Sequence, residues 1–379
     1  MCIRDSYNLL EYVGTISRAD NYLTITNTWL NSETVAPLKI FRGYTAYIVA
    51  RNGGGGTIFG ADASADTGYV SWLGFDLKKW NCGGGLFGPW YANNDNAWHI
   101  YAGTTDGTNG TGFVDDCALG YTLMSGQSPF LVSKLFLGSN QEGVTFSGDL
   151  AYLSLYDGRQ SDSVISNNLA ALRLKMQNRN LPVTTAARVL LFEGDSFTCP
   201  DLSINGGYGQ LIATNLASKP LVNNAAVSGS FIEGPSNRLA FTSKIAISAS
   251  PATRTNVISI LIGCNDMGNR DTNVFWSCLT NYFATQRANG FKVIAVTIPP
   301  RFYGTAAQYN IDRNGINARL RANPQLYDGL ADIATNTLIG LDACSADATY
   351  YDAPTQHPTA AWHAVVAPIV KEQINRWIP

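Results

Sequence analysis

The chain has 379 residues, of which 45% are hydrophobic and only 14% are charged, and its formal net charge is −2 at pH 7. This length predicts two domains, and the hydrophobic share is large enough for packed cores. A nearly neutral chain without a long basic run argues against a nucleic-acid partner, and no stretch approaches the ~18 apolar residues of a membrane span.

The amino terminus shows no secretion signal, because no basic region followed by an apolar run is present. The first six residues, MCIRDS, resemble a translated sequencing-adapter remnant, so the true start is expected to be missing and the lack of a signal carries little information. Few charges and many Gly, Asn and Thr residues are typical of secreted or particle-borne proteins. We therefore expect an extracellular, secreted or virion-associated protein.

The cysteines do not have the spacing of a metal site, since no Cys-x-x-Cys pair occurs. A disulfide between Cys82 and Cys117 is one interpretation, and buried free thiols are the other. The seven cysteines are Cys2, Cys82, Cys117, Cys199, Cys264, Cys278 and Cys344.

The first half, from residue 7 to about 160, consists of short alternating runs separated by Gly, Asn and Asp. Many strands at short spacing without a helical period between them predict an all-β sandwich or jelly roll. Strands are expected at residues 45–51, 57–59, 69–75, 97–102, 131–137 and 148–156.

The end of the first half has a pattern that is specific enough to suggest a particular kind of domain. The stretch GDLAYLSLYDGRQSDSVISNNLAALRLKM reads as a strand, a turn and an amphipathic helix over residues 161–178. It resembles the last strand and closing helix of laminin-G and concanavalin-like jelly-roll modules, and the resemblance covers roughly residues 40–180. It implies a domain that binds carbohydrate or packs beside a catalytic domain. The helix stops at Asn180-Leu181-Pro182, so the predicted domains are residues 7–180 and 183–379.

Aromatic residues in the first half have two interpretations. Exposed rings would suit stacking on sugars, whereas the favoured interpretation is that they fill the sandwich core. His99 lies in a strand pattern and is expected to be structural. The aromatic residues concerned are Trp72, Trp80, Trp90, Tyr91 and Trp98.

In the second half the pattern changes to strands that alternate with helices. This alternation predicts a parallel sheet covered by helices on both faces, a three-layer α/β domain. Strands are expected at residues 189–192, 221–225, 257–262, 292–298 and 330–333, and helices at 208–217, 237–249, 273–289, 307–322 and 359–377.

Polar motifs follow these elements where right-handed crossovers bring loops to one edge of the sheet. The first strand ends in Gly194-Asp195-Ser196, the second in the loop 224–229, and the third in Gly263-Cys264-Asn265-Asp266. The loop 351–359 precedes the last helix and contains His357. A serine in such a turn, a histidine base and nearby amide donors are what nucleophilic catalysis requires.

These four blocks resemble the SGNH (GDSL-type) hydrolase family, which carries Ser, Gly, Asn and His in that order. The resemblance covers residues 188–379, and Gly-x-Asn-Asp after the apolar strand (ISILIGCND) is its most specific part. It implies a flavodoxin-like hydrolase fold with Ser196 as nucleophile and His357 as base. The oxyanion donors would be the backbone N–H groups of Ser196 and Gly229 and the Asn265 amide.

The choice of base also follows from the residues. Only three histidines exist, and His99 belongs to the other domain. His363 lies one and a half turns beyond His357 inside the final helix, so both cannot face the same serine equally. Pro358 suits the first helical turn and leaves His357 in the preceding loop. We therefore expect His357 to be the base and His363 to pack on the sheet.

The sequence departs from the family at one position. An Asp is usual three residues before the histidine, where this chain has Pro354, and the nearest acid is Asp352, five residues before. Either Asp352 orients the imidazole from a longer loop, which we favour, or a backbone carbonyl does so. Asp195 is expected to hold its turn by local hydrogen bonds.

The predicted function is a serine esterase that cleaves acyl esters, with acetylated carbohydrate as the favoured substrate and no metal or organic cofactor. The β-sandwich would bind polysaccharide or support the hydrolase. Two alternatives remain: a lipase or phospholipase acting on long acyl chains, and an adhesin or virion surface protein with a residual hydrolase fold. Intact Ser196, Asn265 and His357 argue against the second.

Overall fold

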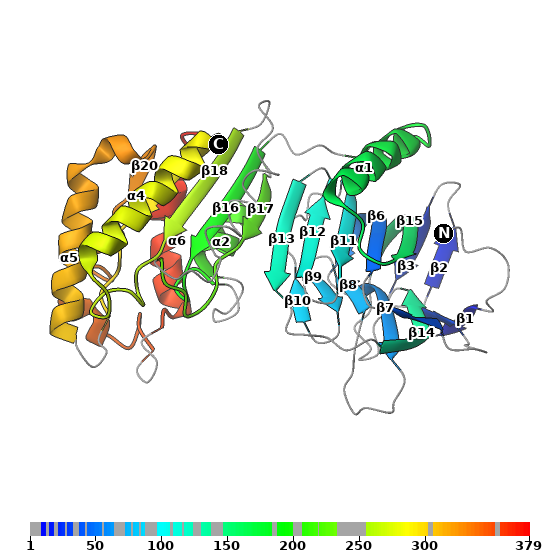
Figure 1. The fold of residues 1–379 in the computed structure, drawn as a ribbon, viewed down its shortest axis with the longest axis horizontal. Coiled ribbons are helices and arrows are strands. Elements are labelled where there is room, and N and C mark those ends of the chain that lie inside the picture. Colours follow the sequence, from blue (N-terminus) through cyan, green and yellow to red (C-terminus); the bar gives the residue numbers. More distant parts are fainter. Residues whose placement is uncertain are drawn as a thin grey trace. The chain divides into compact units, whose positions relative to one another are not determined.

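The computed structural model describes most of the chain and divides it into two compact units, with the boundary between Ala186 and Ala187 (Figure 1). Leu181 is buried within the first unit, and Val183 forms an isolated parallel bridge with Trp98. The described residues are 9–12, 15–18, 22–26, 29–32, 38–41, 44–54, 57–63, 73–76, 79–82, 85–87, 97–106, 109–115, 117–123, 130–137, 147–183, 188–199, 207–218, 220–232, 255–301, 306–352 and 357–379.

The first unit contains two antiparallel sheets and one helix. One sheet has the strand order β1-β4-β14-β7-β8-β9-β10, with β5 paired to β14, and the other has the order β13-β12-β11-β6-β15-β3-β2. The strands are β1 Leu9–Tyr12, β2 Thr15–Arg18, β3 Leu23–Thr26, β4 Trp29–Ser32, β5 Leu38–Phe41, β6 Tyr44–Gly54, β7 Thr57–Ala63, β8 Leu73–Asp76, β9 Lys79–Cys82, β10 Gly85–Phe87, β11 Trp98–Thr105, β12 Asn109–Val114, β13 Cys117–Leu123, β14 Phe130–Leu137 and β15 Ser147–Asp157.

These strands agree with the expected all-β texture. The runs predicted at 45–51, 97–102 and 148–156 are the three strands that pair at the centre of the second sheet, β6, β11 and β15. The strand expected at 69–75 is described only from Leu73 onward. The specific resemblance to a laminin-G or concanavalin-like jelly roll stays a prediction.

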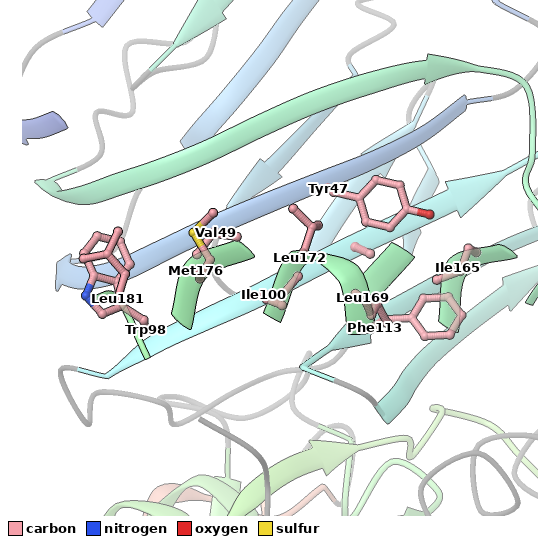
Figure 2. Packing of buried hydrophobic residues seen from close by; sticks show 11 residues of the cluster. Tyr47, Val49, Trp98, Ile100, Phe113, Ile165, Leu169, Leu172, Met176 and Leu181 are labelled. Atoms are coloured by element: carbon pink, nitrogen blue, oxygen red, sulfur yellow. The ribbon is translucent and has the colours of Figure 1, made fainter. Parts of the chain in front are cut away.

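Helix α1, Asp162–Gln177, lies against one face of the second sheet (Figure 2). It begins after Ser161, whose hydroxyl accepts the Val164 N–H at 3.4 Å as an N-cap. Its apolar stripe packs on alternate residues of β6, β11 and β12, and each such side chain stabilises the unit by about 1.5–3 kcal/mol when fully buried. The cluster comprises Tyr47, Val49, Trp98, Ile100, Ala102, Phe113, Ile165, Leu169, Leu172, Met176 and Leu181.

The intervening residues of β6 point to the opposite face of the sheet and are buried as well. Ala46, Ile48 and Ala50 are all fully covered. Because successive side chains of a strand alternate between faces, both faces of β6 are enclosed by protein. Trp98 is only 5% exposed and therefore belongs to the core, as favoured for the aromatic residues. Trp72, Trp90, Tyr91 and the side chain of Trp80 lie outside the described part of the chain.

His99 is structural, as expected. Its Nδ1 lies 3.0 Å from Asp115 Oδ2, and both side chains are buried. Asp115 has a positive φ of 56° and accepts the Ile100 N–H at 3.1 Å through its other carboxylate oxygen. The pair therefore ties the turn after β12 to β11 within the first unit.

The second unit contains a five-stranded parallel sheet with the order β17-β16-β18-β19-β20. Nearly every residue of β16 and β18 is buried, because parallel sheets are covered on both faces. The parallel α/β domain predicted from the alternating pattern is confirmed. The strands are β16 Arg188–Gly194, β17 Leu221–Asn224, β18 Thr255–Leu261, β19 Phe291–Val296 and β20 Gly329–Ala331.

Helices α2 and α6 pack against each other, and α4 packs against α5 (Figure 1). Trp362 of α6 is fully buried and meets Tyr208 of α2 and Phe197 beneath the Gly-Asp-Ser turn, with ring centroids 6.4 and 5.6 Å away. The helix expected at 237–249 lies outside the described residues. The helices are α2 Gly207–Asn215, α4 Thr272–Ala288, α5 Ala306–Ala322 and α6 Ala360–Ile374.

Among the described residues of the second unit, Cys199, Cys264, Cys278 and Cys344 are in the thiol form and not in disulfides, and the thiols of Cys199 and Cys264 are buried. The side chains of Cys82 and Cys117 are not described, so their pairing stays a prediction. Within the described ranges, His, Cys, Asp and Glu side chains nowhere gather in threes in the manner of a metal site. No helix among those residues combines the length and hydropathy that crossing a bilayer requires.

Candidate active site

The order of the parallel strands determines where the motifs meet. From β16 the chain crosses to β17, which lies on one side of β16, and then to β18, which lies on the other side. The loops that follow the adjacent strands β16 and β18 therefore lead in opposite directions. In open α/β sheets this switch point, at the carboxyl ends of the strands, is where ligands bind. Gly194-Asp195-Ser196 and Gly263-Cys264-Asn265-Asp266 lie there.

Asp195 joins these two loops. Its Oδ1 accepts the Phe197 N–H at 3.1 Å, which is the local bond expected from the sequence. Its Oδ2 accepts the N–H groups of Gly263 at 3.2 Å and Cys264 at 2.9 Å. The buried carboxylate therefore holds the serine turn and also fixes that turn to the loop after β18, a role that the motif alone does not reveal.

The serine turn requires glycine at its start. A Cβ on Gly194 would lie 2.2 Å from the Leu261 carbonyl oxygen and 2.4 Å from Thr198 Oγ1. The N–H groups of Thr198 and Cys199 then donate to the Asp195 carbonyl at 3.0 and 2.9 Å. Ser196 lies inside this tight turn and is 3% exposed.

The loop after β17 is bonded to both neighbours. The Val227 N–H donates to the Gly194 carbonyl at 3.2 Å, and the Ile232 N–H donates to the Asp266 carboxylate oxygens at 3.2 and 3.3 Å. Gly229 is exposed with φ +74°, the left-handed region, and a Cβ there would meet no atom within 4 Å. The residue therefore bends the loop and leaves space above its backbone for a ligand.

The Asn265 side chain is oriented by two contacts. Its Nδ2 donates to the Ser230 carbonyl at 3.0 Å, and its Oδ1 accepts from Arg301 Nη1 at 3.3 Å. A primary amide has two N–H donors, so one remains for a ligand. Arg301, which follows Pro299 and Pro300, carries no motif signal, and the sequence alone did not indicate its position at the site.

A short antiparallel pairing presents His357. The Asp352 N–H donates to the His357 carbonyl at 2.9 Å, and the Thr359 N–H donates to the Tyr350 carbonyl at 2.9 Å. Tyr351 and Pro358 form the bridge between these two bonds. In this register Asp352 and His357 stand directly opposite each other. Opposite residues project to the same face with Cβ atoms about 4.5–5.5 Å apart, so this register places the acid that lies five residues before the histidine next to it.

The imidazole lies beside the serine turn. The rings of His357 and Phe197, the residue after Ser196, have centroids 6.3 Å apart. Within the described residues no hydrogen bond joins Ser196 to His357. Catalytic hydrogen bonds often tighten only when substrate is bound. The structure therefore shows that the imidazole and the serine turn are neighbours, and not a proton relay that is already formed.

Partial burial lowers the pKa of His357, and the positive charge of Arg301 lowers it further. The carboxylates of Asp195 and Asp352 act in the opposite direction but do not outweigh these two effects. The imidazole is therefore neutral at neutral pH and able to accept a proton.

His363 is placed differently. It is 2% exposed, its Nδ1 accepts the Tyr208 N–H at 3.2 Å, and its ring stacks on Tyr208 at 6.1 Å. Burial lowers the pKa of His363 to about 4. This side chain anchors the start of α2 and is enclosed, as expected for a residue that packs on the sheet.

The buried imidazole makes a prediction about acid stability. The unfolded chain binds a proton at His363 below about pH 6.5, whereas the folded chain stays unprotonated until pH is near 4. As pH falls from about 6.5 towards 4, this group therefore lowers the free energy of unfolding of the second unit by up to about 1.4 kcal/mol per pH unit. Urea unfolding at pH 7, 6 and 5 measures the slope. The His363→Gln variant should be less stable but show a shallower slope, and parallel slopes would contradict the assignment.

No protein-family model and no curated protein sequence matches this chain. Among solved structures, protein YXIM of Bacillus subtilis is similar over 94% of this chain and 84% of its own, with 14% identity and a TM-score of 0.41. A lipolytic protein of the G-D-S-L family from Veillonella parvula has 18% identity, 50% and 100% coverage and a TM-score of 0.40. A family two carbohydrate esterase from Clostridium thermocellum, in complex with cellohexaose, has 15% identity, 97% and 98% coverage and a TM-score of 0.36.

Proposed function

We propose that the second unit is a serine esterase of the SGNH type that hydrolyses acyl esters, with Ser196 as nucleophile and His357 as base. One observation carries the proposal. The loops after three adjacent parallel strands are cross-bonded at the switch point of the sheet, and a half-buried imidazole with a lowered pKa lies beside the serine turn that they form.

The reaction follows from these positions. Neutral His357 takes the proton of Ser196 Oγ as this oxygen attacks the acyl carbonyl carbon, and the carbonyl oxygen becomes an oxyanion. The N–H groups of Ser196 and Gly229 and the remaining Asn265 N–H donate to it. The imidazolium then returns its proton to the departing alcohol, and the acyl group stays on Ser196. Water activated by His357 releases the acid and restores the enzyme.

The proposed substrates are short acyl esters, acetyl esters of carbohydrate above all, since the preceding unit of antiparallel sheets resembles in sequence the jelly-roll modules that often bind sugars. A panel of acetylated oligosaccharides, short-chain aryl esters and long-chain aryl esters tests this choice. Preference for the acetylated oligosaccharides supports it. Preference for long chains would assign a lipase instead, and glycan binding without any ester turnover would assign an adhesin.

Asp352 is the proposed orienting acid, because its cross-strand register places it opposite His357. Replacing Asp352 by alanine should lower kcat about 10²- to 10⁴-fold, since the imidazole loses both its orientation and a stabilising charge in the transition state. The exposed side chain lies outside the core, so the melting temperature should stay unchanged. Turnover close to that of the wild type would assign the orienting role to a backbone carbonyl.

The protonation state of His357 predicts the pH dependence of the reaction. Because the base acts only when neutral, kcat/KM should fall as pH drops through the lowered pKa of His357, which lies below the usual value of about 6.5. The Asp352→Ala variant loses a charge that raises this pKa, so its acid limb should move to lower pH. Rate profiles of both proteins over pH 4–8 measure the two limbs. An acid limb above pH 6.5 in the wild type would contradict the assignment of the base.

A further inference from the structure

We propose that Arg301 is a positioning residue of this site: it locks the Asn265 amide with one N–H directed to the acyl oxygen and sets a fixed positive charge beside the His357 ring. The inference rests on the proposed esterase for its kinetic consequences. Its electrostatic consequence is measurable without any substrate.

The first support is the contact geometry. A single guanidinium nitrogen, Arg301 Nη1, lies 3.2 Å from the Cys264 carbonyl oxygen and 3.3 Å from Asn265 Oδ1. It therefore connects the segment after β19 with both the backbone and the side chain of the loop after β18. The guanidinium is half-buried. Hydrogen bonds that a charged group donates are stronger than hydrogen bonds between two neutral groups.

The second support is what these contacts do to the amide. Turning the Asn265 side chain by 180° would set its NH₂ group against the guanidinium and its oxygen against the Ser230 carbonyl. Both new contacts would be repulsive, because donor would face donor and acceptor would face acceptor. The Arg301 contact therefore determines which amide atom faces the acyl oxygen.

The third support is the balance of charge around the base. Two carboxylates act on His357, that of Asp195 from the serine turn and that of Asp352 from the opposite strand, and each raises the pKa of the ring. Arg301 is the cation that opposes them. Without it the ring would hold its proton to higher pH and would be a base over a narrower range.

Three variants separate the two effects. Arg301→Lys keeps the charge but not the planar donor, and Arg301→Gln removes the charge but keeps an NH₂ donor of shorter reach. Arg319→Gln is the matched control, because Arg319 also donates to an Asn side chain, Asn273 Oδ1 at 2.8 Å, but joins α5 to α4. Thermal melts of all three establish that the proteins are folded.

The substrate-free measurement is an NMR titration of the histidine ring protons, with His357 assigned from the spectrum of His357→Gln. The chain has only three histidines, so the signals are few. The His357 midpoint should move to higher pH in Arg301→Gln and stay near the wild-type value in Arg301→Lys and Arg319→Gln. Unchanged midpoints in Arg301→Gln would overturn the electrostatic part of the proposal.

The kinetic measurement is kcat and KM against pH on a short-chain aryl ester. In Arg301→Gln and Arg301→Lys, kcat should fall about tenfold, whereas KM should change less than twofold. This fall in kcat is smaller than the one seen when an oxyanion donor is removed outright. Only in Arg301→Gln should the acid limb of the pH–rate profile also move to higher pH. Equal kcat in both variants and the control would overturn the amide-locking role. If the wild type shows no Ser196-dependent turnover, the esterase proposal fails while the titration still decides the charge effect.

Discussion

Replacing Ser196 by alanine is expected to lower kcat for ester hydrolysis by at least about 10⁴-fold, the scale of loss when a serine nucleophile is removed. The loss should be in kcat because the acyl-enzyme can no longer form. Within the described residues the Ser196 hydroxyl makes no hydrogen bond, so its removal leaves no buried group without a partner. The variant should therefore melt at the wild-type temperature.

Initial rates and calorimetric melts of Ser196→Ala and Ser277→Ala provide the comparison. Ser277 is exposed on α4, so the same change there should leave both quantities within error. Residual activity in Ser196→Ala within about tenfold of wild type would contradict the assignment of Ser196 as nucleophile, since the remaining oxyanion donors and substrate binding alone do not supply such rates. Mass spectrometry of protein treated with a fluorophosphonate adds a direct check, because only the wild type should gain the adduct.

Replacing Asp195 by alanine is expected to destabilise the second unit by about 3–6 kcal/mol, because each buried donor left without a partner costs about 1–3 kcal/mol. The carboxylate accepts three backbone N–H groups, those of Phe197, Gly263 and Cys264. All three lie in turns of the site, where a methyl group provides no acceptor. For a unit of this size the loss corresponds to a fall in melting temperature of about 10 °C or more.

Asp271→Ala is the matched control for this prediction. Asp271 also accepts two backbone N–H groups, from Asn273 and Val274 at the start of α4, but it is exposed, so water replaces the lost acceptor. Its loss should cost about 1 kcal/mol, typical of an N-cap. Calorimetry of both variants measures the difference. Equal shifts would mean that Asp195 acts as an ordinary turn residue and does not join two loops.

The sequence alone predicted the elements of the second unit well. β16, β18 and β19 are apolar runs bounded by turn residues, and α4 and α6 have recognisable ends, Asp271 and Thr359 as N-caps. Local composition determines such features, so periodicity reveals them. The order of the strands, β17-β16-β18-β19-β20, is a long-range property that alternation does not specify, and only the structure gives it.

The candidate site was predicted as a set of motifs but not as a network. Ser196, Gly229, Asn265 and His357 are recognisable because each stands in a short pattern. The second partner loop of Asp195 lies 68 residues away along the chain, and the bond from Arg301 to Asn265 joins two different loops. Nothing near these residues in the sequence marks such contacts, since only the assembled sheet brings their loops together. The Asp352–His357 register, likewise, depends on pairing that a loop of unusual length obscures.

The enclosure of β6 restricts where the first unit could recognise a glycan. Flat sugar rings stack on open aromatic faces, but Tyr47 and Trp98 lie under α1, and Ala46, Ile48 and Ala50 face inward on the other side. The broad surface of that central strand is therefore closed to a polymer. A polysaccharide bound by this unit would therefore have to contact it somewhere other than along the two faces of β6.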